Sequence, residues 1–183
     1  MKKNVVLISF DDAVAFWKYK TLFGARLQTP NLDRIMAVST TFQAAYCQSP
    51  LCGPSRASFM SGRSPYETGI LGNDVKAFTI LKPQDIWTWQ LRAGGYYCSS
   101  GGKVHHGYRP LPPEVHEVLY SDERKFFPVD LQVRPGTEIS AVGGAGGGVS
   151  TLNPEDDDKY HDAHSARSFA SFIETYDGHA PFY

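Results

Sequence analysis

A cysteine and an arginine that could act on an anion lie in residues 52–63, whose sequence is CGPSRASFMSGR. The pattern predicts a helix that begins at about Ser55 and ends at Gly62, with Cys52 just before it. The first N–H groups of a helix lack partners and its N-terminal end is partly positive, so it favours a bound anion. Arg56 adds a permanent charge and a fork of donors that matches an oxyanion. These residues predict a thiol in an anion site; an inert thiol beside a capped helix is the alternative.

Two adjacent carboxylates, Asp11 and Asp12, follow the apolar run of residues 4–10. Such a continuous run is typical of a strand that is covered on both faces in a parallel sheet. The carboxylates then lie at the carboxyl end of a strand, where open α/β sheets bind ligands. Adjacent carboxylates repel each other, and a divalent cation relieves the repulsion. The pair therefore predicts a metal site, with an Asp-rich turn or a helix cap as the alternative.

A lysine and two histidines follow a second expected strand, over residues 96–100. The glycine-rich turn after this strand carries Lys103, His105 and His106. A lysine at a strand tip could bind an anion, and a histidine beside it could transfer a proton. A turn of this composition is usually an ordinary surface turn. Whether it belongs to a site depends on the other residues that lie near it.

Strands and helices are expected to alternate around these residues. The further expected elements are a helix from Pro30, a strand at 42–47, a helix at 82–93 and a helix from about 153 to 176. The alternation predicts an α/β fold, with a mostly parallel sheet flanked by helices. Residues 107–152 are richer in proline and glycine, and we expect them to form a loop-rich insertion.

The composition excludes several classes of protein. The chain has 183 residues, 42% of them hydrophobic, which suffices for one domain with a core. A net charge of −1 argues against a nucleic-acid partner, and no apolar run reaches the roughly 18 residues of a membrane helix. Three cysteines are too few for a disulfide framework. The apolar stretch at the start is too short for a signal peptide, so we expect a cytoplasmic protein.

The segment 52–62 resembles the signature of the type I, formylglycine-dependent sulfatases, Cys-x-Pro-Ser-Arg-x-x-x-(Leu/Met)-Thr-Gly. The positions that match are Cys52, Pro54, Ser55, Arg56, Met60 and Gly62. Ser61 stands where the signature has threonine. Residues 27–35 are also similar to a Thr-Pro-Asn-(Leu/Ile)-Asp-Arg-Leu segment of the family. The resemblance implies the α/β fold of the alkaline-phosphatase-like superfamily.

The resemblance also implies a mechanism and its partners. A maturation enzyme would oxidise Cys52 to formylglycine, whose hydrated aldehyde attacks the sulfur of a small-molecule or saccharide sulfate ester. A second hydroxyl then expels sulfate and regenerates the aldehyde. Asp11 and Asp12, with the modified Cys52, would bind Ca²⁺, with Mg²⁺ or Mn²⁺ as alternatives, and Arg56 would hold the formylglycine in place.

The resemblance leaves the histidine of the site open. Many sulfatases carry Gly-Lys-Trp-His-Leu-Gly, which places the histidine at His105. The iduronate-2-sulfatase-like branch, to which we expect the chain to be nearest, carries Gly-Lys-Val-Phe-His and places it at His106. We favour His105 because Gly107 then also aligns. Lys103 aligns in both cases and, with the histidine, would bind sulfate and assist the leaving group.

Two other functions remain open from the sequence. A phosphonate monoester or phosphodiester hydrolase shares the Cys-x-Pro-Ser-Arg loop, and a truncated α/β fragment could be non-catalytic. Sulfatases are considerably longer than this chain and take further metal ligands and a second lysine from later residues. We therefore expect residues 1–183 to be the N-terminal part of a sulfatase catalytic domain, truncated and inactive on its own.

Overall fold

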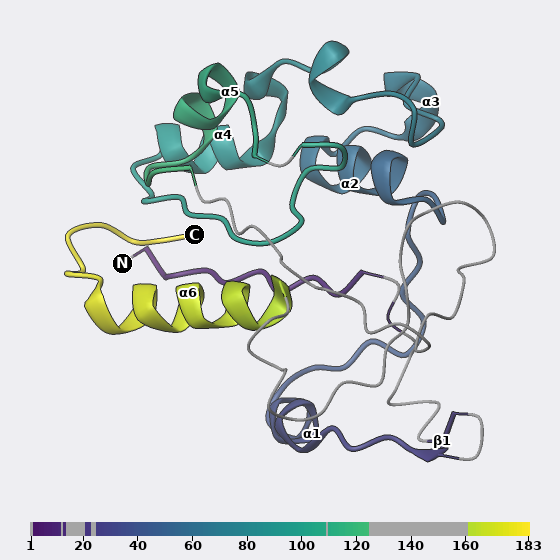
Figure 1. Cartoon of the computed structure of the whole chain (residues 1–183), viewed down its shortest axis with the longest axis vertical. Helices are drawn as coiled ribbons and strands as arrows, with labels where there is room; N and C mark the ends of the chain where they lie inside the picture. Colours follow the sequence, from purple (N-terminus) through teal and green to yellow (C-terminus); the bar gives the residue numbers. More distant parts are fainter. Residues whose placement is uncertain (1, 12, 14–20, 23–24, 109, 125–160) are drawn as a thin grey trace, which may run out of the picture.

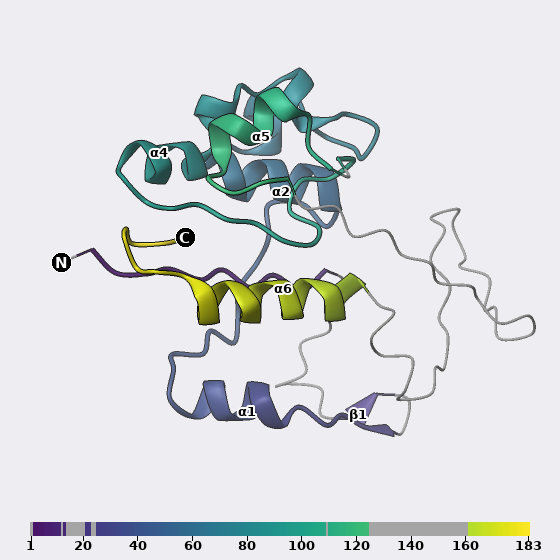
Figure 2. The ribbon, with the colours of Figure 1, turned by 60° about the vertical axis from the view of Figure 1, so that its left-hand side comes forward.

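The computed structural model of the chain describes residues 2–11, 13, 21–22, 25–108, 110–124 and 161–183. Helices α2 to α5 gather at one end of the molecule, and α1 with strand β1 lies at the other (Figure 1). Helix α6 runs beside the N-terminal segment, between these two ends (Figures 1 and 2). The elements are β1 Thr21–Leu22, β2 Ala25–Arg26, α1 Pro30–Ala37, α2 Cys52–Ser61, α3 Pro65–Thr68, α4 Trp87–Ala93, α5 Pro113–Leu119 and α6 His161–Thr175, with 3₁₀ turns at Ala77–Thr79 and Pro83–Asp85.

The hydrophobic core lies among α2, α4, α5 and the segments that join them. Its most deeply buried apolar side chains are those of Met60, Ile70, Ile86, Cys98, Leu119 and Tyr120. Removal of this apolar surface from water is the main force that holds the helices together. The core therefore provides a rigid base on one side of the segments that carry the candidate site.

Helix α2 ends where the sequence predicts but begins earlier. Gly62 closes the helix in a left-handed conformation with φ 70°, which glycine adopts without steric cost. The helix begins at Cys52 rather than near Ser55, so the expected loop position of Cys52 is wrong. Asn73 Oδ1 accepts a hydrogen bond of 2.8 Å from the Gly53 N–H and so stabilises this extra turn. Cys52 therefore belongs to the first turn of α2.

The helix expected over residues 82–93 is interrupted. A 3₁₀ turn over Pro83–Asp85 and helix α4 are separated by Ile86, whose backbone is extended with φ −92° and ψ 130°. Asp85 Oδ2 accepts a hydrogen bond of 2.8 Å from the Lys82 N–H and closes the short turn. The break lets Ile86 reach the core, where it is 1% exposed. Burial of one isoleucine thus overrides the helical pattern.

The mostly parallel sheet remains a prediction. In the described ranges, the strands are the antiparallel pair β1–β2, which we did not predict, and a parallel bridge between Tyr97 and Phe182. The Val5 N–H donates to Phe182 O over 2.9 Å, so the C-terminal segment lies between the N-terminal segment and residues 97–99. The runs at 4–10 and 42–47 are not strands in the structure. A strand needs backbone hydrogen bonds to a neighbouring segment along its length. In the described residues, the run at 4–10 has such a bond at Val5.

Helix α6 packs by an aromatic cluster at its C-terminal end. The rings of Phe172 and Tyr176 lie 5.8 and 5.2 Å from the ring of Tyr97, and Phe182 contacts both. The first part of the expected helix, residues 153–160, lies outside the described residues. In the described helices, no segment is long and apolar enough to cross a membrane. The cluster fixes α6 against the segments that follow the core.

The segment expected as a loop-rich insertion, 107–152, contains helix α5. Pro113 stands in its first turn, and Val115 and Leu119 are 8% and 0% exposed. Residues 125–152, with the glycine-rich run 143–148, lie outside the described residues. The first part of this segment therefore contributes to the core, and it ends close to the candidate site.

Candidate active site

Arg56 connects the three segments that the sequence analysis singled out. It is 6% exposed and lies one helical turn after Cys52 on α2. Its Nη1 donates hydrogen bonds to the carbonyl oxygens of Lys103 and, over 3.2 Å, Val104. Its Nη2 lies 3.3 Å from Asp11 Oδ1. The structure thus brings the motif helix, the N-terminal segment and the glycine-rich turn together around one guanidinium group.

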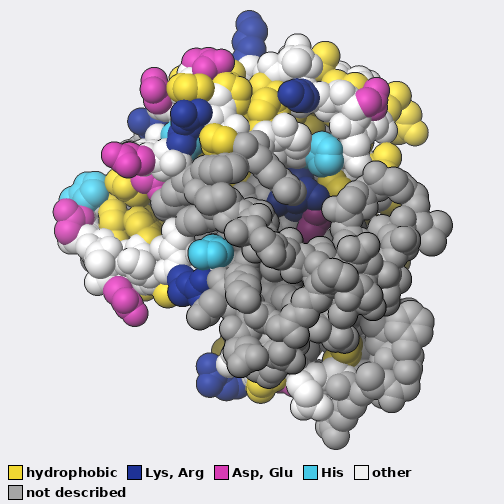
Figure 3. Space-filling view, viewed as in Figure 1, with side chains coloured by type: hydrophobic (Ala, Val, Ile, Leu, Met, Phe, Trp, Pro, Cys, Tyr) yellow, Lys and Arg dark blue, Asp and Glu magenta, His cyan; other side chains and the backbone are white. Residues whose placement is uncertain are grey.

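Asp11 is paired with two cations. Oδ2 accepts a hydrogen bond from Lys103 Nζ, and Oδ1 faces Arg56. Burial raises the pKa of Asp11, but hydrogen bonds from Lys103 and Arg56 and their charges outweigh it and hold the pKa below its usual 3.8. Asp11 is therefore ionised at neutral pH. Figure 3 shows basic side chains beside an acidic one in the middle of the face that it presents.

The donors at the start of α2 are partly used within the protein. The Gly53 N–H donates to Asn73 Oδ1, Pro54 has no N–H, and the Ser55 N–H donates to Leu51 O over 3.0 Å. The first turn of this helix therefore has fewer unpaired N–H groups than the sequence predicts, and anion binding there stays a prediction. An anion beside half-buried Cys52 would be bound mainly by side chains. Arg56 of this helix and Lys103 are cations of the cluster, and both pair with Asp11.

His105 is buried on the side of the turn that faces the core. It is 7% exposed, its Nε2 lies 2.8 Å from Tyr120 Oη, and its ring lies 5.1 Å from that of Phe78. Burial, with the nearby charge of Arg56, lowers the pKa of His105 from its usual 6.5 to about 4. The imidazole is thus neutral at physiological pH, and its hydrogen bond holds it in place.

His106 has a different environment from its neighbour. It is half-buried, and its pKa is lowered by burial and by the charges of Lys103 and Arg56. A hydrogen bond with the Asn73 backbone and the charge of Asp11 act in the opposite direction. The charges of Lys103, Arg56 and Asp11 all influence the pKa of His106. The charge that influences the pKa of His105 is that of Arg56.

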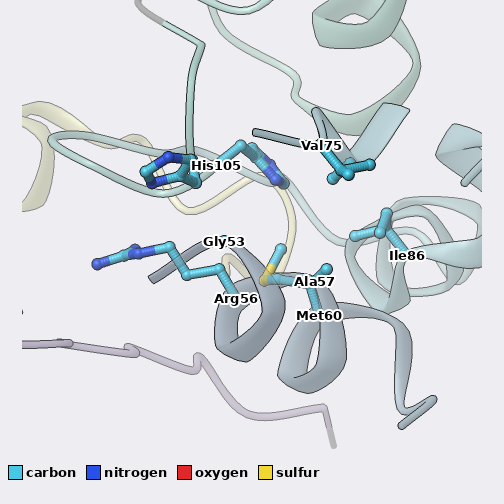
Figure 4. Close-up of a pocket in the computed structure, with 9 residues that line it drawn as sticks. Gly53, Arg56, Ala57, Met60, Val75, Ile86 and His105 are labelled. Atoms are coloured by element: carbon cyan, nitrogen blue, oxygen red, sulfur yellow. The ribbon is translucent and has the colours of Figure 1, made fainter. Parts of the chain in front are cut away.

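A small cavity lies behind Arg56. Gly53, Ala57 and Met60 of α2 face His105, Val75 and Ile86 across it, and the Arg56 side chain extends away from Ile86 (Figure 4). The cavity offers ≈ 10 Å³ to the centre of a water molecule, which is room for about one water. It is too small for an ester. Near Arg56, Asp11 and Lys103 remain about one-third and one-quarter exposed.

Of the three expected metal ligands, the structure describes Asp11 and Cys52. The carboxylate of Asp11 has hard oxygen atoms of the kind that Ca²⁺ prefers as ligands. Its ion pair with Arg56 connects it to α2. Asp12 lies outside the described residues. In the part of the chain that the structure describes, no three His, Cys, Asp or Glu side chains come together as a metal site. The chemistry of Asp11 fits a divalent cation, which remains a proposal.

Comparison with known protein families identifies the family to which the sequence belongs. The model of the family described as Sulfatase matches residues 3–109, which include Cys52, Arg56 and Lys103. The chain belongs to the sulfatase family. This confirms the resemblance carried by the CGPSRASFMSG segment, and the family implies an alkaline-phosphatase-like α/β fold.

Several curated sulfatases are similar to the chain. A "Sulfatase" of Formosa agariphila is 35% identical over 120 residues, 60% of this chain and 22% of the relative. An N-acetylgalactosamine-6-sulfatase of Sus scrofa is 33% identical over 151 residues, 74% of this chain and 28% of the relative. The human iduronate 2-sulfatase is 33% identical over 106 residues, 56% of this chain and 18% of the relative. The chain thus spans about a quarter of the length of these relatives, and the nearest branch remains a prediction. No solved structure was found to match.

Sequence reasoning missed two residues that hold the sulfatase motifs in place. Asn73 binds the first turn of α2 through Gly53, and Tyr120 binds His105. The turn Gly72-Asn73-Asp74 carries an ordinary loop signal, which gives no indication of the helix that it contacts. Tyr120 lies in the segment that matched no motif.

Proposed function

We propose that the protein hydrolyses sulfate esters, with Cys52 as the precursor of its nucleophile. The observation that carries this proposal is the position of Arg56, which lies in the same motif as Cys52 and contacts both Asp11 and the Lys103 turn. This arrangement places two cations around Asp11. Cations near a sulfate ester stabilise the negative charge that develops on the leaving oxygen during cleavage.

Each residue of the cluster has a role in this proposal. Cys52, oxidised to formylglycine by a maturation enzyme, would supply the attacking oxygen of a hydrated aldehyde. Arg56 holds the turn through the Lys103 carbonyl. Lys103, which pairs with Asp11, would bind a sulfate oxygen. We assign the site histidine to His106 rather than His105, since His106 senses the charges of the cluster while His105 is bound to Tyr120. His106, as a neutral imidazole, would donate a hydrogen bond to the leaving oxygen.

The substrate class follows from this chemistry and from the relatives. The pig relative is an N-acetylgalactosamine-6-sulfatase and the human relative is an iduronate 2-sulfatase, and both names refer to sugar derivatives. We propose a sulfate ester of a small molecule or a saccharide as the substrate. A polyanionic nucleic acid is not proposed, since the net charge of the chain is −1.

Relative rates on two model esters test the proposal. The full-length gene product, made in a host that has a maturation enzyme, should hydrolyse an aryl sulfate faster than the matching aryl phosphonate monoester. Both esters have the same leaving group, so the ratio of kcat/KM values reports preference for the transferred group. A higher rate on the phosphonate would replace the sulfatase proposal by a phosphonate hydrolase. Absence of both activities, with formylglycine present, would contradict it altogether.

Asp11, together with Asp12, is proposed to hold a divalent cation, most simply Ca²⁺. The cation would supply positive charge to the sulfate oxygens and to the nucleophile. The Asp11→Asn variant should lose calcium affinity and turnover together, each by at least roughly 10-fold, because a charged oxygen ligand is removed.

Metal content by elemental analysis and turnover on an aryl sulfate are the two measurements for Asp11→Asn. Asp177→Asn is the matched control, since Asp177 is exposed and lies in the C-terminal segment beside His179. A variant that loses turnover but keeps its metal would show that Asp11 acts through Arg56 and Lys103 alone. Full activity with unchanged metal content would remove Asp11 from the site.

A further inference from the structure

Tyr120 reaches the back of the candidate site from an element outside the sulfatase motifs. It follows α5 directly and is 2% exposed, so the whole side chain is enclosed by the protein. Its hydroxyl lies 2.8 Å from His105 Nε2, and the two rings meet edge to face with centroids 6.1 Å apart. Tyr120 thus contacts His105, near the end of the segment 100–106.

We propose that Tyr120 is a positioning residue, which fixes the turn carrying Lys103 and His106 through its hydrogen bond to His105. The inference rests on the proposed function, because it assigns roles in catalysis to the two residues on the turn. It gives His105 a role different from that of a proton donor. The Tyr120 hydroxyl itself would not touch the substrate.

The turn is held from two opposite sides. Arg56 of α2 donates hydrogen bonds to the carbonyl oxygens of Lys103 and Val104, which fixes the backbone on the side of Asp11. Tyr120 fixes the next residue, His105, on the side of the core. These contacts hold residues 103 to 105, which include Lys103 and directly precede His106. Loss of one anchor therefore lets the turn rotate about the other.

The hydrogen bond between Tyr120 and His105 does not depend on pH in the working range. Burial lowers the pKa of His105 to about 4 and raises the pKa of Tyr120 above its usual 10. Both groups therefore stay neutral, with the hydroxyl and the imidazole sharing one donor and one acceptor. Groups that face His105 are Arg56, which carries a fixed charge, and the ring of Phe78. A bond of this kind is suited to constant positioning rather than to proton transfer.

Removal of the hydroxyl alone is the first test. In the full-length gene product, Tyr120→Phe should lower kcat on an aryl sulfate roughly 10- to 100-fold, because a displacement of catalytic groups by about 1 Å has this effect. KM should change less than kcat, since Lys103 keeps its ion pair with Asp11. Tyr66→Phe is the matched control, because Tyr66 is 91% exposed.

A double variant separates positioning from a merely structural role. Tyr120→Phe leaves a buried imidazole nitrogen without its partner, and His105→Phe combined with it removes both polar groups. The melting temperature should fall in the single variant and recover in the double variant, while kcat should stay low in both. If kcat recovers together with the melting temperature, the hydrogen bond serves stability alone and the proposal is overturned.

Hydrogen exchange tests the inference without any activity. Mass spectrometry of peptides that cover residues 99–108 should show faster amide exchange in Tyr120→Phe than in wild type, and unchanged exchange in Tyr66→Phe. Unchanged exchange in this segment of Tyr120→Phe would contradict the positioning role. A wild-type protein that hydrolyses no ester would instead contradict the proposed function, and the exchange result would stand apart from it.

Discussion

Replacement of Cys52 by alanine is expected to reduce turnover of an aryl sulfate by at least about 10³-fold, because it removes the nucleophile of the proposed reaction. The helix that carries Cys52 should remain intact, since alanine is the best helix former and the Gly53–Asn73 hydrogen bond is unaffected. In wild type, the peptide that contains Cys52 should be lighter than its sequence predicts and should react with a hydrazide probe. Neither property should be found in Cys52→Ala.

The other two cysteines provide the controls for this experiment. Cys47 is exposed, and its Sγ contacts Ser49 O over 3.0 Å. Cys98 is buried, and burial raises the pKa of its thiol to about 11, so it remains a thiol rather than a reactive thiolate. Cys47→Ala should keep full turnover and the aldehyde. Peptides that show only an unmodified Cys52 thiol in a host with a maturation enzyme would contradict the formylglycine mechanism.

The two ends of α2 show what a local pattern can predict. Gly62 ends the helix because a glycine is the residue that accepts a left-handed conformation, and this requirement is visible in the sequence. The beginning at Cys52 depends on Asn73, which is 20 residues away. Contacts at such separations are set by the packing of loops, so the sequence alone places the first turn incorrectly.

The adjacent histidines show a different limit. The alignment with sulfatase segments depends on spacing alone, and both His105 and His106 satisfy it. Burial separates them in the structure, because α5 places Tyr120 against one of them. Helix α5 lies in a segment whose proline and glycine content predicts loops, so its contribution to the site could not be predicted.

The apolar run at 4–10 is another case in which pattern and structure differ. Its composition predicts a strand covered on both faces, but Val6, Leu7 and Ile8 are 48%, 54% and 64% exposed in the structure. A buried strand needs neighbours on both edges and both faces. The carboxylate at its end nevertheless reaches Arg56, so the prediction that Asp11 lies at the site does not depend on the strand.

Arg56→Ala is expected to cause the second large loss. It removes the donors to two backbone carbonyls and the ion pair with Asp11, which should lower the free energy of unfolding by roughly 2–3 kcal/mol. The value stays in the lower part of the range for buried pairs because Asp11 is 34% exposed and can be solvated. Turnover should fall by at least about 10²-fold, the effect of removing a donor that stabilises developing negative charge.

Arg56→Lys separates charge from geometry. Lysine keeps the positive charge beside Asp11 but cannot donate at once to Lys103 O, Val104 O and Asp11, because its ammonium group lacks the planar fork. We therefore expect most of the stability to return and most of the loss in kcat to remain. Chemical denaturation and kcat on an aryl sulfate measure the two effects.

Arg63→Lys is the matched control for the arginine series. Arg63 follows the C-terminal end of α2 and pairs with Asp85 over 2.8 Å, but it is 50% exposed. An exposed pair contributes about 0–1 kcal/mol, so this variant should change neither stability nor kcat appreciably. Equal losses at both arginines would mean that α2 is merely destabilised. Full kcat in Arg56→Lys would mean that the charge suffices, and the contacts of the guanidinium group with Lys103 O, Val104 O and Asp11 would then have no special role in catalysis.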